Sequence, residues 1–224
     1  MGKFQRSVGL VVFALALGAA ALLWFAVAAG GPAAGAAPDH GVVFGIWNVF
    51  YNTDAPPSRV IVAACAMAVL FAREGARVVL VDKFEERAKE TLNMIESEGG
   101  EALIVTADLS DLSEASRIAQ AAVSKYGTVD ILVNNAAIPS STSLLDTSVE
   151  LLQSILTVNL AAPFMLTKAV VPVMQAGGGG SIVNISSIAA LRGQGGGGQT
   201  AYASAKAGLE GLMNDVADSY GKDG

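Results

Sequence analysis

Short apolar segments recur along the chain, separated by longer segments that mix apolar and charged residues. Four of them are rich in Val, Ile and Leu: Arg77 to Asp82, Ala102 to Thr106, Ile131 to Asn134 and Ser181 to Ser187. A short β-branched run bounded by glycine or polar residues is typical of a strand that is buried on both faces. The pattern therefore predicts strands that lie inside a sheet covered by helices.

Helical patterns fill the intervals between these strands. We expect helices over Ala66 to Arg73, Glu85 to Ser97, Ser113 to Gly127, about Ser148 to Met174, and over the segment that carries Tyr202 and Lys206. Gly75 and Gly127 follow two of them, and glycine readily adopts the left-handed conformation that ends a helix. Regular alternation of strand and helix predicts an α/β protein with a doubly wound parallel sheet.

Two segments compete for the first strand of this sheet. Arg59 to Ala63 is apolar and runs almost directly into the first helix, whereas Gly41 to Trp47 lies further upstream and is followed by the polar segment Asn52 to Pro57. We place the domain at residues 58–224 and treat residues 31–57 as a linker, with Gly41 to Trp47 as the alternative first strand.

The chain begins with a long apolar segment. Val8 to Gly30 carries no charge and follows Lys3 and Arg6, and about 20 apolar residues suffice to cross a bilayer. We therefore expect a hydrophobic helix over residues 1–30 that anchors the protein in a membrane, with its basic end in the cytoplasm. Two alternatives stay open: a signal peptide cleaved near Ala33 to Ala37, giving a secreted protein, or a misassigned start, giving a cytoplasmic one.

Composition and charge exclude several kinds of site. The chain is 52% hydrophobic and 15% charged, with a formal net charge of −6, and this acidic balance disfavours nucleic acid as a partner. Cys65 is the single cysteine and His40 the single histidine. The sequence therefore predicts no internal disulfide, no histidine-based triad and no metal site.

The candidate chemistry lies near the end of the chain. Tyr202 and Lys206 stand four residues apart, so on a helix they project from the same face. A cation beside a phenol favours the phenolate, which predicts a lowered pKa for Tyr202 and a role in proton transfer. Ser187 closes a predicted strand, and ligands of parallel α/β sheets bind at the carboxyl ends of strands.

Two asparagine positions complete a larger pattern. The strand ending at Asn134 continues as Asn135-Ala136-Ala137, and Asn159 lies on the following helix. Together with Ser187 and the Tyr-x-x-x-Lys of Tyr202, these residues resemble the short-chain dehydrogenase/reductase family, except that Ala137 replaces a glycine. The resemblance implies a Rossmann-like fold and an oxidoreductase that exchanges hydride between a nicotinamide cofactor and a small alcohol or carbonyl substrate.

The same resemblance assigns roles to the catalytic residues. Tyr202 is implied to exchange a proton with the substrate oxygen, and Ser187 to hydrogen-bond that oxygen. Lys206 is implied to lower the pKa of Tyr202 and to bind the nicotinamide ribose, and Asn159 to anchor a proton-relay water. Each residue also has a structural alternative, such as Ser187 capping its own backbone or Asn159 acting as a buried amide satisfied by its neighbours.

Further residues are implied to bind the cofactor. Asp82, at the end of the second predicted strand, would accept hydrogen bonds from the adenosine ribose and repel a 2′-phosphate, which favours NAD over NADP. Asp108 matches the family residue that contacts adenine, although an aspartate that caps a strand end or a helix is equally consistent. Leu109, Asn135 and Ala136 are also implied to line the cofactor site.

The sequence departs from the family pattern at the predicted phosphate loop. Counting back from Glu74-Gly75-Ala76 places Ser58, Val62 and Ala64 where family members carry three glycines. Those glycines let the backbone approach the pyrophosphate at a helix N-terminus. Side chains at these positions predict weak cofactor binding and low activity.

The end of the chain is a second departure. Family members continue after a segment like Tyr220 to Gly224 into further strands and a substrate-covering loop. The resemblance therefore implies a truncated sheet without its sixth and seventh strands, in which Ile182 to Ile185 lie at an open edge. Such an edge predicts a tendency to form homo-oligomers.

Three functional hypotheses follow. The first is an active oxidoreductase that acts on a small alcohol or carbonyl compound. The second is a catalytically silent binding or scaffold protein derived from the same family. The third is a truncated gene product in which the first 63 residues or so replace the authentic first strand and glycine loop.

The apolar segment Val8 to Gly30 generates a first prediction. Expressed in cells, the full chain should sediment with membranes and resist extraction by high salt, because insertion of apolar side chains is not screened by ions. Removing residues 1–38 should release the protein from the membrane fraction. Recovery of the intact, uncleaved chain in the soluble fraction would show that the segment is not an anchor.

Overall fold

The computed structural model of the chain describes residues 41–45, 67–192 and 198–223. Several predictions concern residues outside these ranges: the helix over residues 1–30, the candidate strand Arg59 to Ala63, the positions Ser58, Val62 and Ala64, and the single residues His40 and Cys65. These predictions stay untested by the structure.

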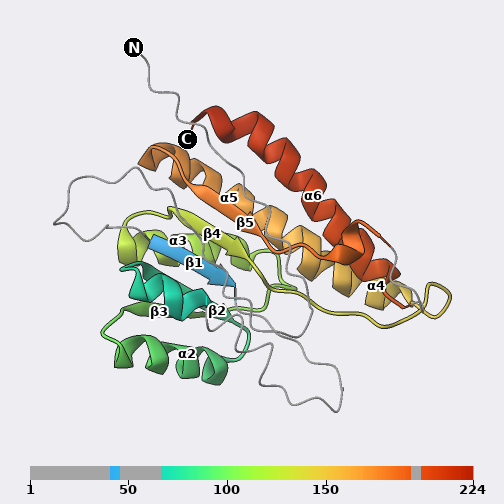
Figure 1. Cartoon of the computed structure of the whole chain (residues 1–224), viewed down its shortest axis with the longest axis horizontal. Coiled ribbons are helices and arrows are strands. Elements are labelled where there is room, and N and C mark those ends of the chain that lie inside the picture. Colours follow the sequence, from blue (N-terminus) through green and yellow to red (C-terminus); the bar gives the residue numbers. More distant parts are fainter. Residues whose placement is uncertain (1–40, 46–66, 193–197, 224) are drawn as a thin grey trace.

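The described residues form one five-stranded sheet (Figure 1). Its strands are β1 (Gly41–Gly45), β2 (Arg77–Asp82), β3 (Ala102–Thr106), β4 (Ile131–Asn134) and β5 (Ser181–Asn184). They pair in the order β3-β2-β1-β4-β5, and every pairing is parallel. The predicted α/β fold with a doubly wound, Rossmann-like parallel sheet is confirmed.

The central strand corrects the predicted domain boundary. β1 pairs with β2 along Gly41–Gly45 and with β4 from Val42 to Phe44. From the sequence, these residues are assigned to the linker 31–57. In the structure they form the first strand, which agrees with the alternative first strand Gly41 to Trp47. The reason is hydrogen bonding, because a strand between β2 and β4 satisfies the facing backbone groups of both.

The predicted helices are present, with one interruption. Residues 67–73 are helical, and the other helices are α2 (Glu85–Ser97), α3 (Glu114–Tyr126), α4 (Val149–Leu156), α5 (Ala162–Gly177) and α6 (Thr200–Tyr220). A π-helical turn, η1 (Thr157–Ala161), joins α4 to α5. Short 3-10 turns, η2 (Ile188–Ala190) and η3 (Gly221–Asp223), precede and follow α6. Gly127 ends α3 with a φ of 85°, as its position predicted.

Alternate residues of the strands face two separate cores, one on each side of the sheet. Val79 and Val81 pack with α3 and α5, whereas Val78 and Leu80 pack with α2 and with the helix at residues 67–73. All four side chains are at most 3% exposed. Burial on both faces explains why these strands are continuous apolar runs instead of alternating ones.

The last strand is shorter than predicted. β5 ends at Asn184, which pairs with Asn134, the last residue of β4. Beyond this pair Ile185 N still donates to Asn134 O at 2.9 Å, but Ser186 and Ser187 lie outside the strand, which the sequence pattern had extended to Ser187. Within the described sheet β5 is an edge strand.

The continuous helical segment from α4 to α5 is a core element of the domain. Residues 149–177 are long and apolar enough to cross a membrane by length and composition alone, but 44% of the relevant window is buried inside the protein. Val158, Leu166 and Val170 belong to the core shared with α3. Its apolar character is therefore explained by packing against the sheet and α3.

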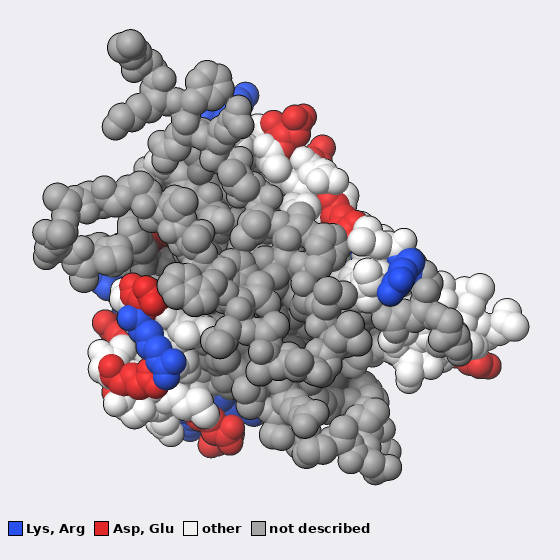
Figure 2. Space-filling view, viewed as in Figure 1, with Lys and Arg blue, Asp and Glu red and all other residues white. Residues whose placement is uncertain are grey.

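Several charged side chains on the described surface form ion pairs. On α2, Lys89 Nζ lies 3.1 Å from Glu85 and 3.3 Å from Glu86, and Arg73 pairs with Glu98 near the end of the same helix. Figure 2 shows basic and acidic side chains side by side on the face of the molecule seen in Figure 1. Interspersed charges of both signs favour solubility over the attraction of one charged partner.

A close helix contact places α6 against the π-helical turn. A Cβ atom built on Gly208 would lie 2.8 Å from Leu160 Cδ2, inside normal contact distance, whereas one on Gly211 would meet nothing within 4 Å. The absence of a side chain at Gly208 therefore lets η1 approach α6. This approach packs η1, which carries Asn159, against α6, which carries Lys206.

The two glycines of α6 give a matched stability prediction. Gly211→Ala should stabilise the protein by about 0.5–1 kcal/mol, because alanine favours the helix and has open space there. Gly208→Ala should be less stable than Gly211→Ala by about 1 kcal/mol or more, since its methyl group overpacks the contact with Leu160. Urea unfolding followed by circular dichroism measures both, and equal stability of the two variants would contradict this packing.

Candidate active site

The predicted catalytic residues meet where the chain leaves β5 and passes beside α6. Lys206 Nζ donates a hydrogen bond to the backbone carbonyl of Ile185 at 2.6 Å. Ser187, two residues further along, lies within hydrogen-bonding reach of the Tyr202 phenol. The structure thus brings Ser187, Tyr202 and Lys206 together at the carboxyl end of a parallel strand, which is where the sequence placed them.

Lys206 is a buried amine. Its side chain is among the largest that are fully enclosed, with 2% of the residue exposed. Burial lowers the pKa of Lys206 to about 8, because the protein interior disfavours the charged form. The amine therefore changes its protonation state close to neutral pH, and its nitrogen lies 5.8 Å from the centre of the Tyr202 ring.

The phenol of Tyr202 behaves differently from the sequence prediction. Burial raises its pKa above the ordinary value, and a hydrogen bond with Ser187 acts in the opposite direction. Desolvation of the half-buried phenol outweighs this hydrogen bond, so the pKa of Tyr202 is raised overall instead of lowered. The implied role of Lys206 in lowering this pKa stays a prediction. Lys206 directs its hydrogen bond to Ile185 instead.

Ser187 serves its own backbone as well as the phenol. Its backbone is extended, with φ −151° and ψ 151°, and its Oγ accepts a hydrogen bond from Ala189 N at 3.2 Å at the start of η2. Ser187 therefore does cap its own backbone, which was the structural alternative to a catalytic role. The two roles are compatible, because a hydroxyl accepts one hydrogen bond while it donates another.

Asn159 holds the loop that follows β4. It is fully buried in η1, its Oδ1 accepts a hydrogen bond from Ile138 N at 2.7 Å, and its Nδ2 donates to Ile138 O at 2.9 Å. The side chain thus satisfies both backbone groups of one loop residue, as a buried amide should. Its implied role in a proton relay stays a prediction.

A second amide pair ties β4 to β5. Asn134 Nδ2 donates a hydrogen bond to Asn184 Oδ1 at 2.8 Å, and both residues are 4% exposed. Asn135 and Ala136, which the resemblance placed in the cofactor site, follow directly, with Asn135 half-buried and Ala136 packed into the core. The pair therefore fixes the strand ends from which this loop departs.

Asp82 is buried at the carboxyl end of β2. Only 2% of the residue is exposed, and its Oδ1 accepts a hydrogen bond from Phe84 N at 2.7 Å. Arg87 Nη2 lies 3.6 Å from the same oxygen. Burial raises the pKa of Asp82 in spite of these favourable contacts, and within the described part of the chain Oδ2 has no hydrogen-bond partner.

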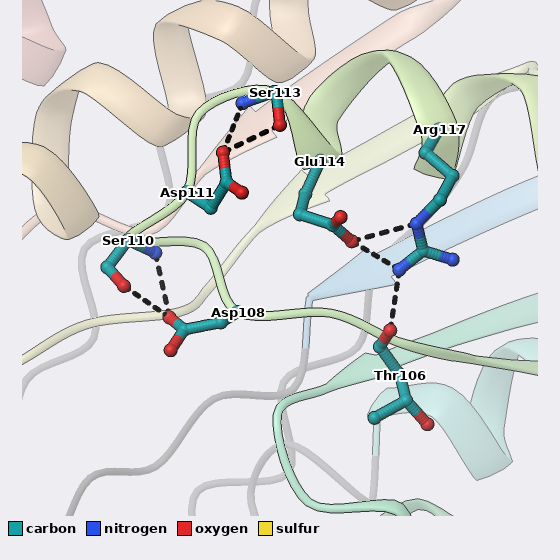
Figure 3. Close-up of polar contacts among 7 residues, drawn as sticks. All are labelled: Thr106, Asp108, Ser110, Asp111, Ser113, Glu114 and Arg117. Carbon is teal, nitrogen blue, oxygen red and sulfur yellow. Dashed lines mark hydrogen bonds and ion pairs between the residues drawn. The ribbon is translucent and has the colours of Figure 1, made fainter.

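Asp108 lies in the loop after β3, shown in Figure 3. Its Oδ1 accepts hydrogen bonds from Ser110 N at 2.9 Å and Ser110 Oγ at 2.7 Å, and Lys83 Nζ lies 2.6 Å from its Oδ2. Burial acts to raise the pKa of Asp108, but the contacts with Lys83 and Ser110 outweigh it and the pKa is lowered. The carboxylate thus caps the loop, whereas the neighbouring Leu109 side chain belongs to the core.

The loop is braced further along by Arg117. This residue of α3 donates to the carbonyl of Thr106 at 2.6 Å and to Glu114 at 2.9 Å (Figure 3). Asp111 Oδ1 in turn accepts hydrogen bonds from the backbone and hydroxyl of Ser113, just before α3 begins. These contacts hold the loop after β3 rigidly at the same sheet edge as the end of β2.

Three polar side chains beside the candidate site were not among the predicted residues. Asn184, Ser186 and Glu210 all contribute side-chain hydrogen bonds near the site. Asn184 could have been found from the rarity of asparagine inside an apolar strand. Glu210 follows Lys206 by four residues, as Lys206 follows Tyr202, and therefore shares their helix face.

The arrangement can bind and protonate an oxygen atom. A hydroxyl and a phenol meet beside a buried amine, and a substrate oxygen that reaches them would receive hydrogen bonds from Ser187 and Tyr202. Asp82 ends β2 and Asp108 follows β3, and because these strands belong to the same parallel sheet the two aspartates lie along the same edge. This edge offers acceptors for hydroxyl and amino groups of a ligand that extends across the sheet.

Curated proteins of known sequence resemble this chain. An uncharacterized oxidoreductase of Thermotoga maritima is 40% identical over 153 residues, which are 68% of this chain and 59% of that protein. A probable galactose dehydrogenase of Rhizobium meliloti is 40% identical over 159 residues, which are 70% of this chain and 61% of that protein. The chain thus spans about three fifths of the length of these relatives.

Solved structures lead to the same family. A metagenomic short-chain oxidoreductase, crystallised in complex with NADP, superposes with a TM-score of 0.72 at 31% identity, covering 83% of this chain and 78% of the other. The sequence model of short chain dehydrogenases matches residues 63–224. The family model covers more than half of the chain, so the chain belongs to the short-chain dehydrogenase/reductase family.

Proposed function

We propose that this protein exchanges a hydride between NAD and a small alcohol or carbonyl substrate. Members of its family are oxidoreductases that use NAD or NADP. The observation that carries the proposal is the cluster of Ser187, Tyr202 and Lys206 at the end of β5. When bound, the nicotinamide cofactor supplies the hydride acceptor or donor, and the side chains of the protein handle the proton.

The residues at the end of β2 fit a dinucleotide. Asp82 Oδ2 is buried without a hydrogen-bond partner among the described residues, and such an atom costs free energy unless a ligand or water satisfies it. A ribose hydroxyl is a donor of the right kind. Hydrogen bonds from such hydroxyls would also favour the ionised carboxylate, against the burial that raises the pKa of Asp82.

Charge at this position supports NAD over NADP. A 2′-phosphate would approach the carboxylate of Asp82 and be repelled by it. The cations nearby are already engaged with carboxylates, because Lys83 pairs with Asp108 at 2.6 Å and Arg87 lies 3.6 Å from Asp82. Binding a 2′-phosphate would therefore require one of these pairs to rearrange.

In the proposed reaction Tyr202 exchanges the proton and Ser187 orients the substrate oxygen. The hydrogen bond with Ser187 lowers the pKa of Tyr202 against the effect of burial, so the serine also eases loss of the phenol proton. Lys206, with a pKa of about 8, is mostly protonated at neutral pH and holds the end of β5 through the carbonyl of Ile185. Asn159 keeps the facing loop in place through Ile138.

A second candidate is a binding protein without catalytic activity. It is favoured by Ser58, Val62 and Ala64, which occupy the expected positions of the phosphate-loop glycines. Side chains there would crowd a pyrophosphate. Titration of the purified chain with NADH, followed by nicotinamide fluorescence, together with a turnover assay over a panel of alcohols and ketones, separates the two candidates.

We further propose that the chain associates with a membrane and with copies of itself. Membrane attachment rests on the apolar segment Val8 to Gly30. Self-association is supported by β5, which is an edge strand of the described sheet and whose residues Ile182 and Val183 are only partly buried. An exposed strand edge with apolar side chains favours pairing with another chain.

The proposed role of Tyr202 predicts a large loss of activity on removal of its hydroxyl. Tyr202→Phe should lower kcat by at least about 100-fold, the usual scale for losing a general acid or base. The ring remains, so folding should be unchanged by circular dichroism. Tyr220→Phe, at the exposed end of α6, is the matched control and should retain full activity. A Tyr202→Phe enzyme as active as the parent would refute the assignment.

Cofactor preference generates a separate prediction. The unmodified protein should bind NAD more tightly than NADP, and Asp82→Ala should narrow the difference by removing repulsion of the 2′-phosphate. Glu90→Ala removes a carboxylate from the exposed side of α2 and should leave the preference unchanged. Calorimetric titration measures the dissociation constants of NAD and NADP for each variant. Tighter binding of NADP than of NAD by the unmodified chain would contradict the prediction.

A further inference from the structure

A row of three polar side chains runs along one face of α6. Tyr202, Lys206 and Glu210 occupy positions i, i+4 and i+8, and this spacing keeps them on the same side of the helix. The row faces residues 185–187, the segment that leaves β5. Tyr202 and Lys206 belong to the proposed reaction, whereas Glu210 has so far had no role.

Glu210 contacts this segment through a buried serine. Ser186 is 6% exposed, and its hydroxyl donates a hydrogen bond to Glu210 Oε1 at 3.1 Å, with the carbonyl of Lys206 as a longer second acceptor at 3.4 Å. A hydrogen bond to a charged acceptor is stronger than one between neutral groups, and a buried hydroxyl that loses its partner is costly. The contact is therefore an energetically significant link between α6 and the strand end.

The contact lies between the two catalytic ones. Ser186 is bonded covalently to Ile185, whose carbonyl accepts from Lys206, and to Ser187, which reaches Tyr202. Fixing the middle residue limits how far its two neighbours can move relative to α6. The hydrogen bond between Ser186 and Glu210 thus helps to align the Ser187 hydroxyl and the Lys206 amine with the Tyr202 phenol. It involves none of the atoms that would react.

We propose that Glu210, acting through Ser186, is a positioning residue that aligns Ser187 and Lys206 with Tyr202. The proposal rests on the proposed function for its catalytic consequence, but its geometric consequence is independent of turnover. A positioning role for Glu210 differs from a role in which the carboxylate only stabilises the fold or only contributes a negative charge. The required feature is a hydrogen-bond acceptor at the position of Oε1.

The titration of Tyr202 reports this alignment directly. The hydrogen bond with Ser187 lowers the pKa of Tyr202, so misalignment of Ser187 should raise that pKa. Loss of a nearby negative charge would act in the opposite direction and lower it. The sign of the change therefore separates a positioning role of Glu210 from an electrostatic one.

The experiment uses protein labelled with ¹³C at tyrosine Cζ, with the Tyr202 signal assigned by its absence in Tyr202→Phe. Glu210→Ala and Ser186→Ala should each raise the pKa of Tyr202, in the same direction as Ser187→Ala. Glu210→Gln keeps an acceptor oxygen and should leave the pKa near that of the parent. Asp218→Ala removes an exposed carboxylate of the same helix and should change nothing.

Kinetics supplies a second readout if the parent protein turns over. Glu210→Ala and Ser186→Ala should lower kcat on the order of tenfold with an unchanged KM for the cofactor, since misplacement affects the chemical step. The double variant Ser186→Ala/Glu210→Ala should be no worse than either single one, because the two residues act through one contact. Glu210→Gln should restore activity.

The outcomes separate this proposal from the proposed function. A raised pKa of Tyr202 in Glu210→Ala, in a parent chain without turnover, would support positioning and count against the enzyme. Unchanged Tyr202 titration and unchanged kcat in Glu210→Ala and Ser186→Ala would overturn positioning. A lowered pKa in both Glu210→Ala and Glu210→Gln would also overturn it, in favour of a purely electrostatic role. If Glu210→Ala fails to fold, Ser186→Ala and Glu210→Gln decide the matter.

Discussion

All the strands of the described sheet run in one direction, and this constraint decides where the polar side chains gather. Parallel strands need a crossover between each pair, so every strand ends at the same edge and is followed there by a loop. Asp82 and Asn134 end β2 and β4, whereas Asp108 and Ser187 follow β3 and β5, yet all four share this edge. The helices that cover both faces leave the edge as the place where a ligand meets polar groups.

Burial of charge and hydrogen-bonding groups gives this edge its chemistry. Lys206 and Asp82 are each 2% exposed, and a charged group in such a position is costly unless it has partners. Lys206 has the carbonyl of Ile185, whereas one oxygen of Asp82 has no partner among the described residues. The first contact holds the site together, and the second leaves an acceptor available to a ligand.

The pKa of Tyr202 is raised by burial, whereas the spacing of Tyr202 and Lys206 predicted a lowered one, and this difference has a simple physical origin. A pair of residues four apart on a helix suggests a Coulomb interaction, and that argument considers only the charge. In the folded protein the phenol also loses water, and the amine that was expected to stabilise the phenolate donates to Ile185 instead. Desolvation and competition for hydrogen bonds are set by neighbours from other elements, which helix spacing does not reveal.

The sequence by itself determined the α/β class, nearly all helix and strand segments, and the set Ser187, Tyr202 and Lys206, because periodicity and spacing are local properties. It left the first strand open between two segments, since both are apolar and only pairing with β2 and β4 distinguishes them. Tertiary structure alone decided that β5 stops at Asn184, that Asn159 binds the backbone of Ile138, and that Ser186 meets Glu210. Each of these depends on a hydrogen-bond partner far away in the chain, and a partner of that kind is fixed only when the sheet and helices pack.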